Sequence, residues 1–296
     1  MIKNCGECHQ MKKIAIFPNR SRDPDFQVTN HLVEEIVKNG GQPVIEPELA
    51  GGFRSSHIEF NSYTDCDFII CLGGDGTFLS AAHHPTSKGL PQIGINLGSV
   101  GFLTEIEPDQ IAQAVPLLLS GQYQIEERMM LNVKCYDHNS NLIDHGYALN
   151  DVVLCRGGGN TGILTFDLTI DNNAVERIPG DGIIVASPTG STAYNLAAGG
   201  PIVHPQVNVI LITPLAPHTL HNRTYITDSR SVVKLQLVKT SGPAIFSIDG
   251  RQDIEVEADH YALLSGSEMQ FNKIRLSDDK FYQTLPSKIQ LRGMAR

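Results

Sequence analysis

The first half of the chain alternates short apolar runs with stretches of helical periodicity. Ile14–Pro18 is an apolar run closed by proline, and Asp25–Lys38 then places apolar residues at helical spacing before Gly40. The same order recurs where the strand pattern Phe68–Leu72 is followed by a glycine-rich turn and a helical pattern over Thr77–His84. Alternation of this kind predicts a parallel sheet with flanking helices.

One more strand and one more helix complete this first region. An apolar run surrounds Ile93–Ile95, and a helical pattern extends from Glu107 to Ser120. It stops at Gly121, where a residue with positive φ would cap the helix. We therefore expect an α/β domain over residues 11–124.

From about Gln124 the apolar spacing changes to a period of two, which is typical of strands. Turn residues separate the apolar runs, as at Asp137–Asn139 and Asp171–Asn173. Strands are expected at Leu131–Tyr136, Val152–Cys155, Leu164–Ile170, Ile183–Ala186, Val207–Ile212 and Val232–Leu237. We expect a boundary near residues 122–126, a mainly-β domain over 125–270, and a C-terminal segment, 271–296, that returns to the first domain.

Composition and charge narrow the classes of partner. The 296 residues are 41% hydrophobic and 19% charged, which suits a folded protein with two cores. The net charge of −9 supplies no basic stripe for a nucleic acid or an anionic membrane. The longest apolar stretches, such as Val207–Thr213, are far shorter than the roughly 20 residues that span a bilayer, and no signal-peptide core precedes them. We expect a cytoplasmic protein with small-molecule partners.

The six cysteines are too few and too scattered to indicate a secreted disulfide framework. Cys5–His9 matches the attachment pattern of a c-type haem, but that chemistry belongs to exported proteins. No second pair of Cys or His at ligand spacing follows nearby to share a zinc ion. We expect residues 1–10 to be a flexible tail and the protein to hold no metal site of its own.

Three glycines surround one carboxylate directly after a strand pattern and before a helix. The loop is Gly73, Gly74, Asp75, Gly76 and Thr77. Glycine lets the backbone approach a phosphate closely, and the helix N-terminus adds partial positive charge. The Asp can bind the metal of a nucleotide or take a proton from an attacking hydroxyl. No Gly-Lys-Ser/Thr follows, so the loop is not a Walker P-loop, and a capped tight turn is the alternative without a ligand.

A second glycine-rich segment, Gly157–Gly162, matches the spacing of the dinucleotide fingerprint. That fingerprint must open a helix, whereas Ile163–Ile170 alternates like a strand. We therefore expect these glycines to form a hairpin connection.

A third candidate runs from Gly180–Gly182 through a strand pattern into Ser187–Gly200. Ser and Thr crowd the start of a short predicted helix, which ends at paired glycines and carries one aromatic residue, Tyr194. Hydroxyls and free N–H groups at a helix N-terminus suit a phosphorylated or ribose-bearing ligand. An ordinary capped helix is the alternative.

Four segments in this order resemble the NAD kinase family across nearly the whole chain from Met11. They are Gly73–Thr77, Asn96–Leu103, Asn150–Asp151 and Gly180–Pro205. The first is shared with diacylglycerol and sphingosine kinases, and phosphofructokinases have a similar loop. The long block that reaches Gly200–Pro201 is distinctive of NAD kinases.

The resemblance implies roles for individual residues. Asp75 would be the general base that activates the 2′-hydroxyl of the adenosine ribose of NAD, and Gly73, Gly74 and Thr77 would form the phosphate loop. Tyr194 and Phe102 would offer flat surfaces to the rings of NAD. The residues implied in NAD binding are Gly76, Phe102, Asn150, Asp151, Asp181, Thr192, Ala193, Tyr194, Asn195, Leu196, Ala197, Asp249 and Arg251.

The resemblance also implies a donor and an assembly. The donor would be ATP or polyphosphate, with Mg²⁺ or another divalent cation, and the chain would form a homodimer or homotetramer. A lipid kinase of the diacylglycerol type, which shares only the first motif, and a non-catalytic NAD sensor are the alternatives.

Two positions depart from the family pattern. The family usually has Asn-Glu where this chain has Asn150-Asp151, which shortens the acidic side chain by one methylene. Many relatives place a basic residue two positions before the acidic residue at 181, where this chain has Pro179. Arg177 lies two positions further back. The choice between NAD and NADH therefore stays open.

Overall fold

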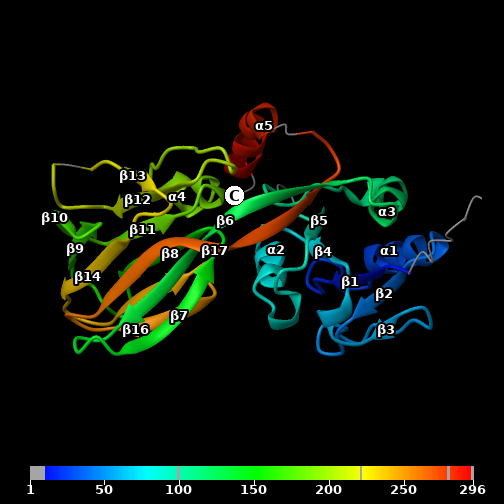
Figure 1. The fold of residues 1–296 in the computed structure, drawn as a ribbon, viewed down its shortest axis with the longest axis horizontal. Coiled ribbons are helices and arrows are strands. Elements are labelled where there is room, and N and C mark those ends of the chain that lie inside the picture. Colours follow the sequence, from blue (N-terminus) through cyan, green and yellow to red (C-terminus); the bar gives the residue numbers. More distant parts are fainter. Residues whose placement is uncertain (1–10, 99–100, 221, 279–280, 295–296) are drawn as a thin grey trace, which may run out of the picture. The chain divides into compact units, whose positions relative to one another are not determined.

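The computed structural model describes residues 11–98, 101–220, 222–278 and 281–294. The chain divides into two compact units: unit 1 is Met1–Glu126 with Asn272–Arg296, and unit 2 is Glu127–Phe271. The chain passes into unit 2 within strand β6 (Gln124–Tyr136) and leaves it within strand β17 (Tyr261–Arg275) (Figure 1). The tail expected over residues 1–10 lies outside the described residues.

Unit 1 is an α/β layer structure. Its elements are β1 (Lys13–Phe17), α1 (Gln27–Lys38), β2 (Gln42–Ile45), β3 (Glu59–Phe60), β4 (Phe68–Gly73), α2 (Asp75–Ala82), β5 (Gln92–Asn96), α3 (Ile111–Leu119) and α5 (Phe281–Met294). The strand order β3-β2-β1-β4-β5 is parallel throughout, and the end of β17 pairs with β5 at Lys273 and Gln92. The predicted parallel sheet with helices is confirmed.

Helix α1 shows how the sequence places its ends. It begins at Gln27, later than expected, because Phe26 adopts a left-handed conformation with φ 53°. The buried carboxylate of Asp23 then accepts the N–H of Thr29 at 2.8 Å and its hydroxyl at 2.7 Å, which satisfies orphan donors of the first turn. The apolar stripe, including Leu32 and Ile36, is buried in the unit 1 core. Helix burial therefore follows the 3.6-residue period.

The helix predicted over Glu107–Ser120 is shorter than expected. A 3₁₀ turn covers Pro108–Gln110, and α3 occupies only Ile111–Leu119. Gly121 adopts φ 76°, as its predicted capping role requires.

Unit 2 consists of strands, with short helices on one connection. Its further elements are β7 (Leu142–Ala148), β8 (Asp151–Arg156), β9 (Leu164–Ile170), β10 (Asn173–Gly180), β11 (Gly182–Ala186), α4 (Tyr194–Ala197), β12 (Val209–Leu215), β13 (Tyr225–Asp228), β14 (Val233–Lys239), β15 (Ala244–Ile248) and β16 (Gln252–Val256). One sheet is antiparallel in the order β13-β12-β11-β8-β15-β16. The other contains β10-β9-β14-β17, with β6 pairing β17 and β7. The predicted mainly-β second half is confirmed.

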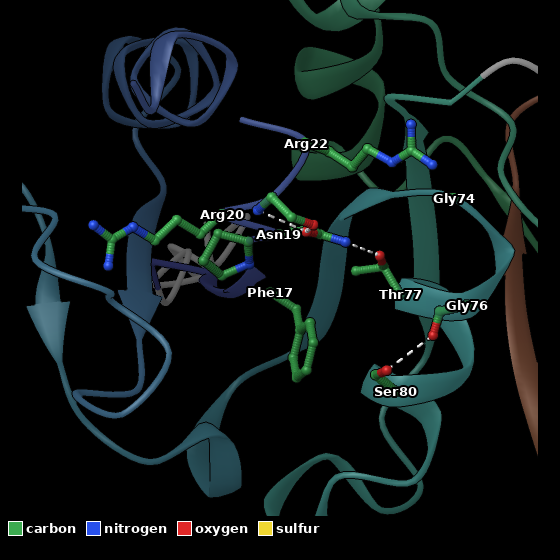
Figure 2. A pocket seen from close by; sticks show the side chains of 10 residues that line it. Phe17, Asn19, Arg20, Arg22, Gly74, Gly76, Thr77 and Ser80 are labelled. Carbon is green, nitrogen blue, oxygen red and sulfur yellow. Dashed lines mark hydrogen bonds between the residues drawn. The ribbon is translucent and has the colours of Figure 1, made fainter. Parts of the chain in front are cut away.

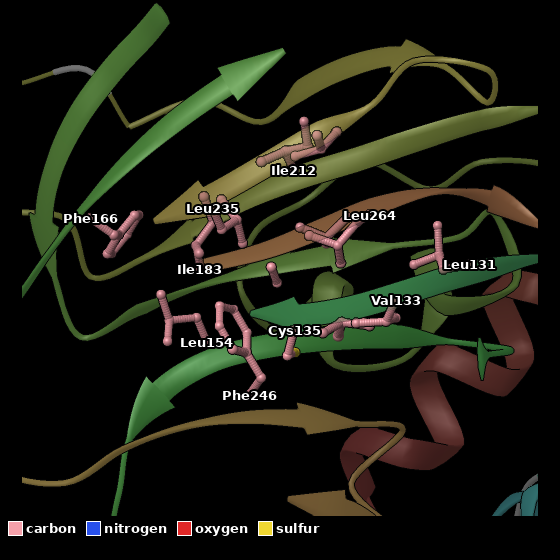
Figure 3. Close-up of a cluster of buried hydrophobic side chains, with 14 of the residues drawn as sticks. Leu131, Val133, Cys135, Leu154, Phe166, Ile183, Ile212, Leu235, Phe246 and Leu264 are labelled. Carbon is pink, nitrogen blue, oxygen red and sulfur yellow. The ribbon is translucent and has the colours of Figure 1, made fainter. Parts of the chain in front are cut away.

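The core of unit 2 lies between these two sheets. Figure 3 shows Leu154, Ile183 and Phe246 of one sheet facing the same cluster as Phe166 and Leu235 of the other. Alternate residues of the first sheet, such as Val153 and Ile184, join a second buried cluster on its opposite face. Ala198 and Val203, from the connection after β11, pack against that cluster. Because both faces of its central strands are covered, their sequence reads as an unbroken apolar run.

The glycine-rich segment Gly157–Gly162 is not the hairpin that we expected. It connects β8 to β9, and these strands belong to different sheets, so it is a crossover between sheets. A Cβ on Gly157 would lie 2.8 Å from Pro243, and one on Gly162 would overlap the side chain of Ser241. The glycines therefore allow close packing against the β14–β15 connection. A strand follows them, which confirms that they do not open a dinucleotide-binding helix.

A buried ionic cluster in unit 1 joins the segments where the chain leaves this unit and returns to it. Arg275 places Nη1 2.9 Å from Glu126 Oε2 and Nε 3.3 Å from Glu105 Oε2. Lys273 Nζ lies 3.6 Å from the same Glu105 oxygen, while Glu105 Oε1 accepts the N–H of Leu276 at 2.9 Å. Buried charges are tolerated when they are paired in this way. The cluster ties the end of β17 to the start of β6 and to the segment after β5.

None of the helices that the structure describes combines the length and hydropathy needed to cross a membrane.

Replacement of Arg275 by Ala should lower the free energy of unfolding by about 3–5 kcal/mol, because Glu105 and Glu126 both lose the guanidinium that pairs with them in the protein interior. Arg230→Ala is the matched control, since its ion pair with Asp228 is exposed. Urea unfolding of both variants measures the difference. Equal stability of the two variants would contradict a structural role for the buried cluster.

Candidate active site

The carboxylate of Asp75 is fixed by backbone N–H groups. Strand β4 ends at Gly73, Gly74 is the N-cap of α2, and Asp75 is the first helical residue. Asp75 Oδ1 accepts the N–H of Leu103 at 2.9 Å, and Oδ2 accepts that of Phe102 at 3.1 Å. The glycine loop and the end of the Asn96–Leu103 motif therefore lie together. A negative charge is also favoured at the N-terminus of a helix.

The glycines of the loop serve two different purposes. A Cβ on Gly73 would overlap the side chain of Thr77, so packing requires glycine there. A Cβ on Gly74 or Gly76 would meet no atom within 4 Å, and neither residue has a positive φ. Neither packing nor backbone conformation requires glycine at positions 74 and 76. The space that a side chain would occupy at these two positions is open. A phosphate can therefore approach the backbone there.

A cavity of about 590 Å³ lies on this side of the loop. Its walls are the β1–α1 connection and the start of α2: Phe17, Pro18, Asn19, Arg20, Ser21, Arg22, Gly74, Gly76, Thr77 and Ser80. Asn19 Nδ2 donates to Thr77 Oγ1 at 2.6 Å, which anchors one wall to the other (Figure 2). The cavity therefore borders the glycine loop directly.

Two arginines of this cavity were not found by sequence reasoning. In Figure 2, Arg22 extends toward the Gly74 side of the loop, whereas Arg20 points to the opposite side. Within the described part of the chain, neither guanidinium forms an ion pair. The structure brings them to the loop because β1 and β4 are adjacent parallel strands, so the residues that follow the two strands lie at one edge of the sheet.

In unit 2, Asn150 lies in the turn between β7 and β8, and Asp151 is the first residue of β8. The carboxylate of Asp249 accepts the N–H groups of Leu149, Asn150 and Asp151 at 2.7, 2.8 and 2.9 Å. Burial and, secondarily, the charge of Asp249 raise the pKa of Asp151 to about 7. Ser187 lies on the other side of this turn, where its N–H donates to the carbonyl oxygen of Asn150 at 2.8 Å. Three of the implied NAD-binding residues thus form one cluster.

The segment after β11 is not one short helix, as expected. A 3₁₀ turn over Thr189–Thr192 is followed by the single turn α4. The side chain of Asn195 is fully buried, where Oδ1 accepts the hydroxyl of Thr213 at 2.6 Å. Tyr194 is 49% exposed. Thr192 is also buried, whereas Ala193 and Leu196 are partly exposed and Ala197 is exposed.

The remaining implied residues lie in less confined places. Asp181 pairs with Arg156 at 3.1 Å, and Arg156 is another residue that sequence reasoning missed. Arg177 instead pairs with Asp167 at 2.7 Å on the β9–β10 hairpin. Arg251 is exposed at the turn that carries Asp249.

Phe102, in unit 1, has its ring 5.6 Å from Lys288 Nζ of α5. The distance is within the range of a cation–π contact.

Comparison with known proteins shows similarity over nearly the whole chain. The model of the ATP-NAD kinase N-terminal domain matches residues 21–123, and that of the C-terminal domain matches residues 149–276. An NAD kinase of Ruminiclostridium cellulolyticum is 43% identical over 283 residues, which cover 94% of this chain and 98% of the relative. An NAD kinase of Acetivibrio thermocellus is 37% identical over 287 residues, which cover 96% and 99%.

Solved structures share the fold. Yeast NADH kinase, complexed with NADH, aligns with a TM-score of 0.83 at 21% identity, covering 95% of this chain and 88% of the yeast chain. An NAD kinase of Archaeoglobus fulgidus in complex with ATP aligns with a TM-score of 0.70 at 23% identity, covering 95% and 99%. The two domain models and the near full-length relatives together establish that this chain belongs to the NAD kinase family.

Proposed function

We propose that this chain transfers the γ-phosphoryl group of ATP to the 2′-hydroxyl of the adenosine ribose of NAD, which yields NADP and ADP. The observation that carries this proposal is the oriented carboxylate of Asp75 beside the open backbone of Gly74 and Gly76. A hydroxyl acceptor needs a base, and the phosphoryl group needs N–H donors that can approach it closely. The loop supplies both.

Asp75 acts as the general base. Each of its oxygens accepts one backbone N–H, which leaves a lone pair on each to accept the proton of the attacking 2′-hydroxyl. The backbone at Gly74 and Gly76 stabilises the transferred phosphoryl group, and Arg22 adds positive charge on the Gly74 side of the cavity. Little covalent chemistry is required of the protein, because phosphoryl transfer depends on positioning and charge.

A divalent cation, Mg²⁺ in the simplest case, accompanies the donor. No group of three or more His, Cys, Asp or Glu suited to a metal ion occurs in the described ranges. Such a cation would be held by phosphate oxygens of the donor and would neutralise part of their charge. Because arginine and backbone N–H groups recognise phosphate rather than adenine, inorganic polyphosphate is a second candidate donor.

Unit 2 holds NAD in this proposal. The turn of Asn150 and Asp151 supplies polar groups for a ribose, and Asp181 supplies a further acceptor. The exposed ring of Tyr194 supplies a stacking surface, as does Phe102 of unit 1. Thr192–Ala197 positions Tyr194, since Asn195 is buried beneath it and bonded to Thr213. Gly76 and Arg251 complete the set. We further propose a cytoplasmic homodimer or homotetramer.

A coupled assay tests the function. Purified protein with NAD, ATP and Mg²⁺ should form NADP, detected by an NADP-specific dehydrogenase. NAD binding without NADP formation under varied donors and metals would favour the sensor. Phosphorylation of lipid dispersions but not of NAD would favour the diacylglycerol-type kinase.

Asp75→Asn should lower kcat about 10²- to 10⁴-fold, because a positioned general base contributes that much. Asp109→Asn, at an exposed carboxylate of the same unit, is the control and should keep full turnover. Steady-state kinetics and thermal melting are measured together, so that a folding defect is recognised. Near-normal turnover in a folded Asp75→Asn variant would remove Asp75 from the role of base.

Arg22→Ala should raise the KM for ATP about 10-fold, since a charge-assisted hydrogen bond to phosphate is lost, and leave the KM for NAD unchanged. Arg54→Ala removes an exposed arginine of the same unit outside the cavity and is the matched control. A rise in the KM for NAD, or equal effects of both variants, would argue against donor binding in this cavity.

Tyr194→Ala should raise the KM for NAD about 5- to 150-fold through loss of a stacking surface, and Tyr194→Phe should have a smaller effect. Because Tyr194 is half-exposed, the melting temperature should change little in both variants. An unchanged KM together with a large fall in melting temperature would show that the ring serves packing instead.

A further inference from the structure

Asp249 lies in a turn whose conformation is explained by its local sequence. It connects β15 to β16, and Arg251 N–H donates to the carbonyl oxygen of Ile248 at 3.0 Å. Asp249 and Gly250 both have positive φ, 51° and 63°. Asp-Gly is a preferred pair for such a two-residue hairpin. Local backbone preference accounts for an Asp here, but Asn would fit the turn equally well.

The carboxylate of Asp249 does something that the turn does not require. Its Oδ2 accepts the N–H of Leu149 at 2.7 Å, and its Oδ1 accepts those of Asn150 at 2.8 Å and Asp151 at 2.9 Å. The N–H of Asp249 in turn donates to the carbonyl oxygen of Asp151 at 2.9 Å. Four hydrogen bonds therefore join one residue to three consecutive residues nearly 100 positions earlier.

The three N–H groups need an acceptor because the chain changes sheets at this point. Strand β7 ends at Ala148 in one sheet and β8 begins at Asp151 in the other, so Leu149 and Asn150 lie outside both ladders and Asp151 is at the first position of its own. Three consecutive N–H groups that converge on one point form an anion-binding concavity. The carboxylate of Asp249 fills it from within the protein.

The opposite side of the turn is equally confined. Ser187 donates its N–H to the carbonyl oxygen of Asn150 and its hydroxyl to that of Leu149. A Cβ on Gly190 would overlap the backbone of Asn150. The turn is held on both sides, which fixes the direction in which Asn150 presents its side chain.

We propose that Asp249 is a positioning residue, which fixes the Leu149–Asp151 turn and thereby sets the affinity for NAD without contacting NAD. The proposal rests on the proposed function, because it assigns NAD binding to Asn150. It differs from the contact role that family resemblance implies, since the carboxylate already accepts three backbone N–H groups, one more than Asp75 accepts.

Asp249→Asn is the informative variant. Asn preserves the hairpin turn but replaces one oxygen by an NH₂ group, which opposes an N–H of the 149–151 turn. We expect the Kd for NAD to rise about 10-fold and the KM for ATP to stay unchanged. Asp259→Asn is the matched control, since Asp259 also has a positive φ, 68°, in a different turn of unit 2. It should bind NAD normally.

Amide hydrogen exchange without NAD separates positioning from contact. In the wild-type protein the amides of Leu149, Asn150 and Asp151 should be protected, and Asp249→Asn should speed their exchange at least about 10-fold while the β15–β16 amides stay protected. Weakened NAD binding with unchanged exchange at 149–151 would overturn the proposal, because Asp249 would then contact NAD. Unchanged binding in the variant would overturn it as well. If the wild-type protein neither binds NAD nor forms NADP, the proposed function fails, whereas the exchange rates still decide whether Asp249 fixes the turn.

The ionisation of Asp151 gives a second readout. Its pKa is raised to about 7 by burial and by the charge of Asp249, so its neutral form stabilises the fold and that stability is lost as the pH rises through about 7. Removal of the Asp249 charge should lower the pKa of Asp151. Carboxyl ¹³C NMR of Asp151 as a function of pH measures this change. An unchanged titration of Asp151 in Asp249→Asn would contradict the close coupling of the two residues.

Discussion

Backbone N–H groups that are not paired within a helix or sheet need another acceptor. In three segments of this protein an aspartate carboxylate is that acceptor. Asp23 accepts the orphan donors of α1, Asp75 accepts those of Phe102 and Leu103, and Asp249 accepts three in the 149–151 turn. An unmet N–H buried in a protein costs about 1–3 kcal/mol. Each carboxylate therefore accepts N–H groups that no strand or helix pairs, and two of these segments belong to the proposed site.

The same interaction also orients the chemistry. At Asp75 the backbone donors hold the carboxylate while leaving lone pairs unused, so the group that shapes the loop can also accept a proton. At Asp249 three N–H groups converge on the carboxylate, so we assign it the positioning of its turn and assign the contact with NAD to Asn150. Two aspartates with similar partners thus have different roles, because the number of N–H groups that converge on each differs.

The two units divide the work. Unit 1 provides an open cavity with two arginines, Arg20 and Arg22, and two glycines at which an added Cβ would meet no atom. Such a cavity is suited to a charged phosphate chain of variable length. Unit 2 provides groups held in fixed positions by a two-sheet core, which is suited to a ligand with many polar atoms to match. The buried ionic cluster of Arg275 serves the architecture, since it secures the segment where the chain leaves unit 2 and rejoins unit 1.

The sequence by itself determined the elements whose burial follows a simple period and the loop whose glycines flank Asp75. Strands β4, β9 and β11 and helices α1 and α2 were predicted within a few residues, because apolar spacing records local burial. Strands β7, β10, β13, β15, β16 and β17 were not, since partly exposed strands mix polar and apolar residues. Only the tertiary structure decided that Gly157–Gly162 crosses between sheets, that Arg22 lines the Gly74 cavity, and that Asp249 binds the 149–151 turn. These are pairings between distant segments, and no local pattern encodes which strand will lie beside which.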